Sequence, residues 1–198
     1  MSDFDEEWWN SVEEALAVGQ RTAVTSEELN EALDHIVRLL MDASLLLESG
    51  SHATSCFLAI TALEETAKIH IGMYRRSAEP VPRKKDALFR HDKKHHIAAA
   101  PTVAMGSRLQ GAIGENRLHE LLELARSGGL VDLREASLYI GKAKDKVQLP
   151  SVSITTATAR ELLLFAIESF DDALVGYTNH SFDLSKLTDE LFLKWKEA

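Results

Sequence analysis

The stretch FLAITALEETAKIHIGMY, residues 57–74, decides the fold, because it is long, helical in pattern and largely apolar. Its apolar residues recur all around a 3.6-residue period, so no side of the helix is marked as facing water. Such a helix is typical of a buried position. It nevertheless carries Glu64, Glu65, Lys68 and His70. Ionised side chains are costly in a core unless they are paired, so each of these charges needs a partner.

Two explanations of these charges stay open. Glu64 and Lys68 are four residues apart with the acid first, so they can form an ordinary ion pair on the exposed side of the helix. However, residues 53–63 contain no charged residue, which leaves the helix without a marked solvent side. The second explanation is therefore that the charges meet another part of the protein, a ligand or a second subunit.

The segments that precede this helix are also helical in pattern. Residues 25–50 begin with a capping box of Thr25 and Glu28 and end at Gly50, a typical residue just beyond a helix. Apolar residues between them form one stripe at three- and four-residue steps. Residues 4–18 predict a shorter amphipathic helix. The helix of the opening stretch is predicted from about residue 51 to 76, because Pro80 and Pro82 prevent its continuation.

Further helices are predicted along the rest of the chain. They cover residues 85–100, stopped before Pro101; residues 103–126, bent around Gly106, Gly111 and Gly114; residues 155–180; and a short helix from residue 184. Gly128 and Gly129 predict a turn, and residues 131–141 are interpreted as irregular. The expected fold class is therefore all-α, a helical bundle with three long helices and short terminal helices. We expect one domain over residues 1–198, with residues 1–20 and 183–198 as peripheral helices.

The composition indicates which broad class of protein this chain belongs to. The chain has 198 residues, 45% hydrophobic and 27% charged, which is ordinary for a globular protein. The acidic N-terminus lacks a secretory pattern, the single Cys56 excludes an internal disulfide framework, and no apolar run reaches the roughly 20 residues of a membrane span. A cytoplasmic protein is expected. The net charge is −9, but residues 75–96 are strongly basic, which indicates either a positive patch or a solvated linker.

The end of this basic segment, RHDKKHH at residues 90–96, has a chemical use. Metal-independent RNA cleavage needs a base for the 2′-OH proton, an acid for the leaving oxygen, and positive charge on the phosphate. Histidine supplies proton transfer near neutral pH, and arginine or lysine supplies the charge. Two alternatives stay open: a metal site, because His91 and His95 have the i,i+4 spacing, and a plain solvated basic helix.

Three pieces of the chain, taken in order, resemble the AbiV family of abortive-infection proteins in the HEPN superfamily. They are ITALEETAKIHIG at residues 60–72, FRHDKKH at residues 89–95 and DLREASLYI at residues 132–140. Together these pieces span about residues 51–141, and the family-like part of the domain is expected over about residues 25–180. It implies a role in phage defence, a helical bundle that forms a homodimer, and RNase activity through an Arg-x(4–6)-His motif at a two-fold composite site.

The resemblance also implies which residues act. The catalytic candidates are Arg90, His91 and His95; the supporting or substrate-binding candidates are Glu64, Glu65, Lys68, Lys94 and His96. Arg90 would bind the scissile phosphate, and Lys94 would hold the RNA backbone. No metal and no cofactor are expected, and RNA is the expected partner. Because a fold does not dictate catalysis, the alternative is a non-catalytic defence module that binds a phage or host protein.

Overall fold

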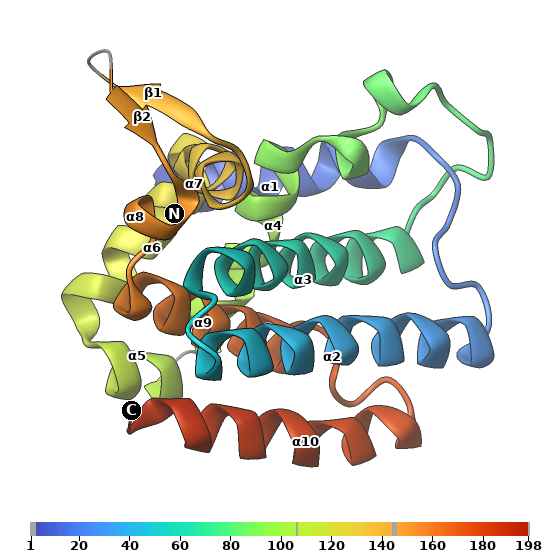
Figure 1. The fold of residues 1–198 in the computed structure, drawn as a ribbon. Helices are drawn as coiled ribbons and strands as arrows, with labels where there is room; N and C mark the ends of the chain where they lie inside the picture. Colours follow the sequence, from blue (N-terminus) through green and yellow to red (C-terminus); the bar gives the residue numbers. More distant parts are fainter. Residues whose placement is uncertain (1–2, 106, 144–145, 198) are drawn as a thin grey trace.

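A computed structural model describes residues 3–105, 107–143 and 146–197, and it confirms the all-α prediction (Figure 1). The elements in chain order are α1 (Asp3–Ala17), α2 (Ser26–Glu48), α3 (His52–Met73), the 3₁₀ turns η1 (Arg83–Lys85) and η2 (Ala87–Phe89), α4 (His91–Met105), α5 (Ser107–Ile113), α6 (Glu115–Ser127), α7 (Gly129–Leu138), β1 (Gly141–Ala143), β2 (Lys146–Gln148), α8 (Pro150–Ser153), α9 (Thr156–Leu174) and α10 (Asn179–Lys196).

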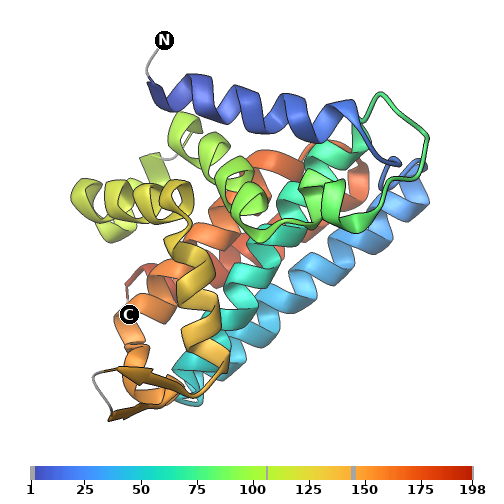
Figure 2. The same ribbon diagram turned by 90° about the horizontal axis from the view of Figure 1, so that it is seen from above.

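Helix α3 is the central helix of the bundle. It packs on α2 and α9 along one side and on α4 and α7 along another, and α1 also contacts it (Figures 1 and 2). From residue 55 to residue 73 every side chain is buried or half-buried. The expectation that this helix has no water-facing side is therefore correct, and the charges within it must meet other elements.

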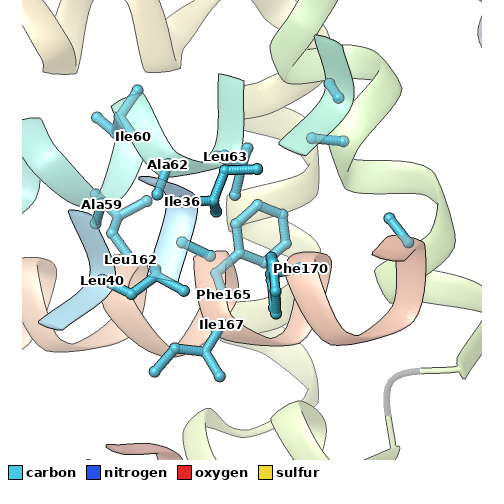
Figure 3. Packing of buried hydrophobic residues seen from close by; sticks show 14 of the residues in the cluster. Ile36, Leu40, Ala59, Ile60, Ala62, Leu63, Leu162, Phe165, Ile167 and Phe170 are labelled. Carbon is cyan, nitrogen blue, oxygen red and sulfur yellow. The ribbon is translucent and has the colours of Figure 1, made fainter. Parts of the chain in front are cut away.

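The core lies where α2, α3 and α9 face one another. Figure 3 shows side chains that meet there, from α2 Ile36 and Leu40, from α3 Ala59, Ala62 and Leu63, and from α9 Leu162, Phe165 and Phe170. Burying one such large apolar side chain contributes about 1.5–3 kcal/mol relative to leaving it in water. In the described part of the chain, no helix is both long enough and apolar enough to cross a membrane.

The predicted ends of α2 are confirmed. The Thr25 hydroxyl accepts a hydrogen bond from the Glu28 amide, and the Glu28 carboxylate accepts one from the Thr25 amide. Such a cap stabilises a helix by about 0.5–2 kcal/mol. At the other end, Gly50 has a φ of 82°, a left-handed conformation that glycine adopts without strain.

The prediction of a helix over residues 85–100 is wrong at both ends. Asp86 accepts a hydrogen bond from the Leu88 amide and pairs with the buried Arg75 guanidinium, which holds this segment as two short 3₁₀ turns. Arg90 is extended, and α4 starts only at His91. Helix α4 also continues past the predicted stop, Pro101, to Met105.

The continuation through Pro101 has a physical basis. Proline lacks an N–H group, so the carbonyl of Ile97 loses its normal partner four residues later. The indole N–H of Trp8 in α1 donates to that carbonyl at 3.3 Å. A side chain from the N-terminal helix thus replaces the bond that the proline removes.

Two further boundaries differ from the prediction. Residues 129–138, partly interpreted as irregular, form α7, and the small antiparallel hairpin of β1 and β2 follows it. The single helix predicted over residues 155–180 ends at Leu174, because Gly176 has a φ of 105° and Thr178 caps a new helix. Helix α10 therefore starts at Asn179 rather than at residue 184. The predicted breaks at Gly114 and Gly128 are confirmed, whereas Gly106 lies outside the described residues.

Candidate active site

Glu64 lies in the middle of α3, and its side chain is only 3% exposed. Donors from two other helices surround its carboxylate. Oε2 lies 2.8 Å from His91 Nδ1 and 2.8 Å from Lys94 Nζ, and Oε1 lies 2.9 Å from His95 Nε2. The guanidinium of Arg134 in α7 forms an ion pair with the carboxylate, with its Nε 3.4 Å from Oε1. We call these five residues, Glu64, His91, Lys94, His95 and Arg134, the Glu64 cluster.

The environment keeps Glu64 ionised. Burial alone raises the pKa of this carboxyl group, but the hydrogen bond from His95 and the charge of Lys94 outweigh it and lower the pKa from 4.5 to about 2. An ionised carboxylate only accepts hydrogen bonds, with room for about four of them. The ring nitrogens that face it, Nδ1 of His91 and Nε2 of His95, must therefore both carry protons.

The two histidines differ in what their other ring nitrogen can do. The His95 side chain is fully buried, burial lowers its pKa despite the neighbouring Glu64, and its Nδ1 has no hydrogen-bond partner in the part of the chain that the structure describes. The His91 side chain is 43% exposed. In the neutral form of His91, a hydrogen bond from Nδ1–H to Glu64 leaves the Nε2 lone pair for a molecule arriving from solvent.

Lys94 and Arg134 give the cluster a net positive charge. The Lys94 side chain is 7% exposed and the Arg134 side chain 22% exposed, and within the described residues Glu64 is the carboxylate that both of them contact. Arg134 also stacks over the Phe57 ring, with its Cζ 4.7 Å from the ring centre. Two cations on one carboxylate leave one positive charge beside His91, which favours an anionic ligand.

The chain matches the model of a known protein family. The family model for the HEPN family AbiV matches residues 26–170, which run from the start of α2 through most of α9. The chain belongs to the AbiV family. This is a family of abortive-infection proteins, which indicates a role in phage defence, and all three resembling pieces lie within the match. Neither the curated proteins nor the solved structures yield a match.

In this AbiV chain the predicted site residues fall into two groups. Glu64, His91, Lys94 and His95 meet in the Glu64 cluster, although they come from two separate helices. Arg90 lies outside it: its side chain is 47% exposed and its guanidinium bonds Asp92 at 2.7 Å. Arg90 is therefore a more exposed cation next to His91 than Lys94, whose ammonium is buried against Glu64.

Glu65 and Lys68 are also outside the cluster, and their pairing corrects the sequence prediction. Lys68 does not pair with Glu64; its ammonium lies 2.7 Å from Glu65, three residues earlier. Both side chains are partly exposed. The reason is that Glu64 points toward α4 and α7, where stronger donors surround it, while Glu65 lies farther round the helix.

His96 lies on the side of α4 that faces away from Glu64. His96 faces α1, where its Nδ1 lies 3.2 Å from the Ser11 hydroxyl, so it does not join the Glu64 cluster. Among the side chains that the structure describes, no group of three or more histidines, cysteines and acids is arranged to hold a metal ion. His91 and His95 both hydrogen-bond the Glu64 carboxylate, and the Lys94 ammonium bonds it too. This positive charge beside the two imidazoles opposes the binding of a metal ion there.

The residue that sequence reasoning missed as part of the site is Arg134. It lies in DLREASLYI, which carries part of the family resemblance, but that segment was interpreted as irregular. As part of α7, Arg134 faces α3 and reaches both Glu64 and Phe57. The signal in the sequence is an arginine within a family motif. Its contact with Glu64 depends on the packing of α7 on α3, which the local sequence pattern does not indicate.

Proposed function

We propose that this AbiV protein is a metal-independent endoribonuclease, with His91 as the group that moves protons. The observation that supports this most directly is the Glu64–His91 pair. A buried, ionised carboxylate that holds one ring nitrogen of a half-exposed histidine orients the ring and fixes its tautomer. The other nitrogen is then available at the protein surface.

The proposed reaction uses the substrate's own hydroxyl. Nε2 of His91 takes the proton of the 2′-OH, the 2′-oxygen attacks the adjacent phosphorus, and the bond to the 5′-oxygen breaks. That 5′-oxygen leaves with a proton from an acid, either water or the second His91 of a two-fold site. The products are a 2′,3′-cyclic phosphate and a 5′-OH end. Arg90 and Arg134 stabilise the negative charge that builds on the phosphate.

The first test compares RNA with DNA. We expect the purified protein to cleave single-stranded RNA in the presence of EDTA and to leave a 2′-deoxy oligonucleotide of the same sequence intact, because the attack needs the 2′-OH. Gel electrophoresis of end-labelled substrates measures both rates. Cleavage of both substrates would contradict the proposed chemistry, and absence of RNA cleavage would favour the non-catalytic alternative below.

The proposal includes a two-fold dimer, and the surface beside the cluster supports it. Large apolar side chains, 43–76% exposed, gather between residues 138 and 152; they are Leu138, Tyr139, Ile140, Val147, Leu149 and Val152. Leu138 is one helical turn beyond Arg134, so this surface adjoins the Glu64 cluster. A second copy that covers it would bury the apolar area and bring the two sites toward one axis.

Dimerisation is measured by light scattering at micromolar concentration. We expect a mass of two chains for the wild type and of one chain for Ile140→Asp, because a carboxylate in an apolar interface loses its hydration. The matched control is Leu193→Asp, since Leu193 in α10 is similarly exposed at 63% but lies in a different helix. A monomeric wild type, or a dimer unaffected by Ile140→Asp, would contradict this interface.

A second function is favoured by the depth of the cluster. His95 and Lys94 are buried and both bond the Glu64 carboxylate, which also suits a purely structural polar core. The chain would then be a non-catalytic module that binds a phage or host protein. Wild type that does not cleave RNA, together with toxicity retained by an Arg90→Ala plus His95→Ala variant, would favour this alternative.

A further inference from the structure

Helix α1 is an unusually acidic element placed beside basic residues. Its sequence, DFDEEWWNSVEEALA, holds six carboxylate residues and no lysine or arginine. It runs along α4, and the family match, residues 26–170, does not include it (Figure 2). Val12 and Ala15 of α1 are buried in the core, while Glu13 and Glu14 of the same helix are exposed. An acidic surface thus lies against the helix that presents His91.

The side chains of α1 occupy the cations next to His91. Glu14 Oε2 lies 3.1 Å from Lys93 Nζ, and Glu14 Oε1 lies 3.9 Å from the Arg90 guanidinium, whose nearer carboxylate is Asp92 at 2.7 Å. The Ser11 hydroxyl is 3.4 Å from the same Lys93 ammonium. Arg90 and Lys93 are the partly exposed cations at the start of α4, with side chains 47% and 25% exposed. Glu14 therefore stands where the phosphate of a bound nucleic acid would be attracted.

The two ends of α1 are held differently. At its C-terminal end, the buried Arg75 side chain donates to the Ala15 carbonyl at 3.0 Å, and the Arg76 amide donates to the Leu16 carbonyl at 3.0 Å. The preceding turns are held by the Trp8 indole bond to the Ile97 carbonyl at 3.3 Å, while Glu14 stands in the anchored last turn, next to Ala15. Exposed ion pairs are weak and screened by salt, so the Glu14 side chain can leave Arg90 and Lys93 while the α1 backbone stays in place.

We propose that α1 is an acidic strap that competes with the RNA backbone for Arg90 and Lys93. While Glu14 contacts these two cations, the chain binds RNA weakly. When RNA phosphates displace Glu14, Arg90 and Lys93 contact the phosphates instead. The identity of the polyanion as RNA rests on the proposed function. The strap itself rests on the contacts of Glu14 and on the anchored C-terminal end of α1.

The test removes the competing charge and keeps the net charge matched. Glu14→Gln and Glu13→Gln each delete one carboxylate from neighbouring exposed positions, and of these two glutamates Glu14 is the one that contacts Arg90 and Lys93. The probe is a labelled single-stranded RNA oligonucleotide in EDTA, bound to each variant in a His91→Asn background that prevents cleavage. Circular dichroism checks that both variants fold as the wild type does.

We expect Glu14→Gln to bind this RNA about 3- to 10-fold tighter than Glu13→Gln, which should match the parent. Because two more cations then release counterions, the slope of log affinity against log salt should steepen, by up to about 1.4 for two phosphate contacts on a single strand.

Equal affinities and salt slopes for the two variants would overturn the strap, whether or not the parent protein binds RNA. The outcome is separable from the proposed nuclease activity, which is measured with His91 intact. Tighter binding by Glu14→Gln without any cleavage would support the strap and reject the nuclease. Cleavage with no difference between the Glu14 and Glu13 variants would support the nuclease and reject the strap.

Discussion

Replacing Glu64 by glutamine is expected to lower the free energy of unfolding by about 3–5 kcal/mol, the usual cost of removing one partner from a buried ionic group. The variant leaves Lys94 with an uncompensated charge at 7% exposure. It also puts an amide NH₂ group where the carboxylate accepted hydrogen bonds, so that donors face a donor. Urea unfolding followed by circular dichroism at pH 7 measures the loss.

The neighbouring residue supplies the control for this prediction. Glu65→Gln removes the same charge from the next position of α3, but Glu65 is 22% exposed and its partner Lys68 is 27% exposed. Such a partly solvated pair contributes no more than about 1 kcal/mol. Similar losses for the two variants would mean that the Glu64 cluster adds no special stability.

The dependence on pH gives an independent check. The pKa of Glu64 in the folded chain is about 2, below its ordinary value of 4.5. A depressed pKa means that the ionised group stabilises the fold fully above about pH 4.5 and loses this contribution as pH falls toward 2. The stability difference between wild type and Glu64→Gln should therefore be constant near neutral pH and shrink across that acidic range.

Elements with strong local signals could be predicted from the sequence. The start of α2 follows from Thr25 and Glu28, because a capping box joins residues only three positions apart, and its end follows from Gly50. The burial of α3 also followed from its apolar circumference. In each case the deciding interaction lies within one turn of helix or in the composition of one segment.

The course of α4 could not be predicted, because distant residues decide it. Asp86 is held by Arg75, which delays the start of the helix, and Trp8 satisfies the Ile97 carbonyl that Pro101 leaves without a partner. Trp8 and Ile97 are 89 positions apart in the chain. Single-sequence rules treat proline as a stop, and they have no means to include a donor supplied from another helix.

The same distinction holds for the site. The sequence indicated that Glu64 needs a partner, and the i,i+4 rule offered Lys68, which instead pairs with Glu65. The observed partners in α4 are 27–31 positions away. Which histidine can reach a ligand likewise depends on burial. His91 and His95 share one motif, but the packing of α4 on α3 leaves His91 half-exposed and buries His95.

Substitution of His91 by asparagine is expected to reduce single-turnover RNA cleavage by about 10²- to 10⁴-fold, the usual contribution of a general base or acid. Because the His91 side chain is 43% exposed, and asparagine still has an NH₂ group to offer a nearby carboxylate, its stability should change little. Asparagine cannot take up the 2′-OH proton. Rates with a labelled oligonucleotide in EDTA, together with thermal unfolding of the same samples, measure both effects.

Two further histidine variants show which imidazole works. His119→Asn changes an exposed histidine of α6 whose Nδ1 contacts the Glu115 carbonyl of its own helix, and should keep both rate and stability. His95→Asn removes a fully buried ring and one of the hydrogen bonds to Glu64, so it should lower stability first and reduce the rate through misplacement of Glu64 and His91. A folded His91→Asn variant with the full wild-type rate would contradict the catalytic role of His91. The imidazole that remains in the Glu64 cluster would then be that of His95.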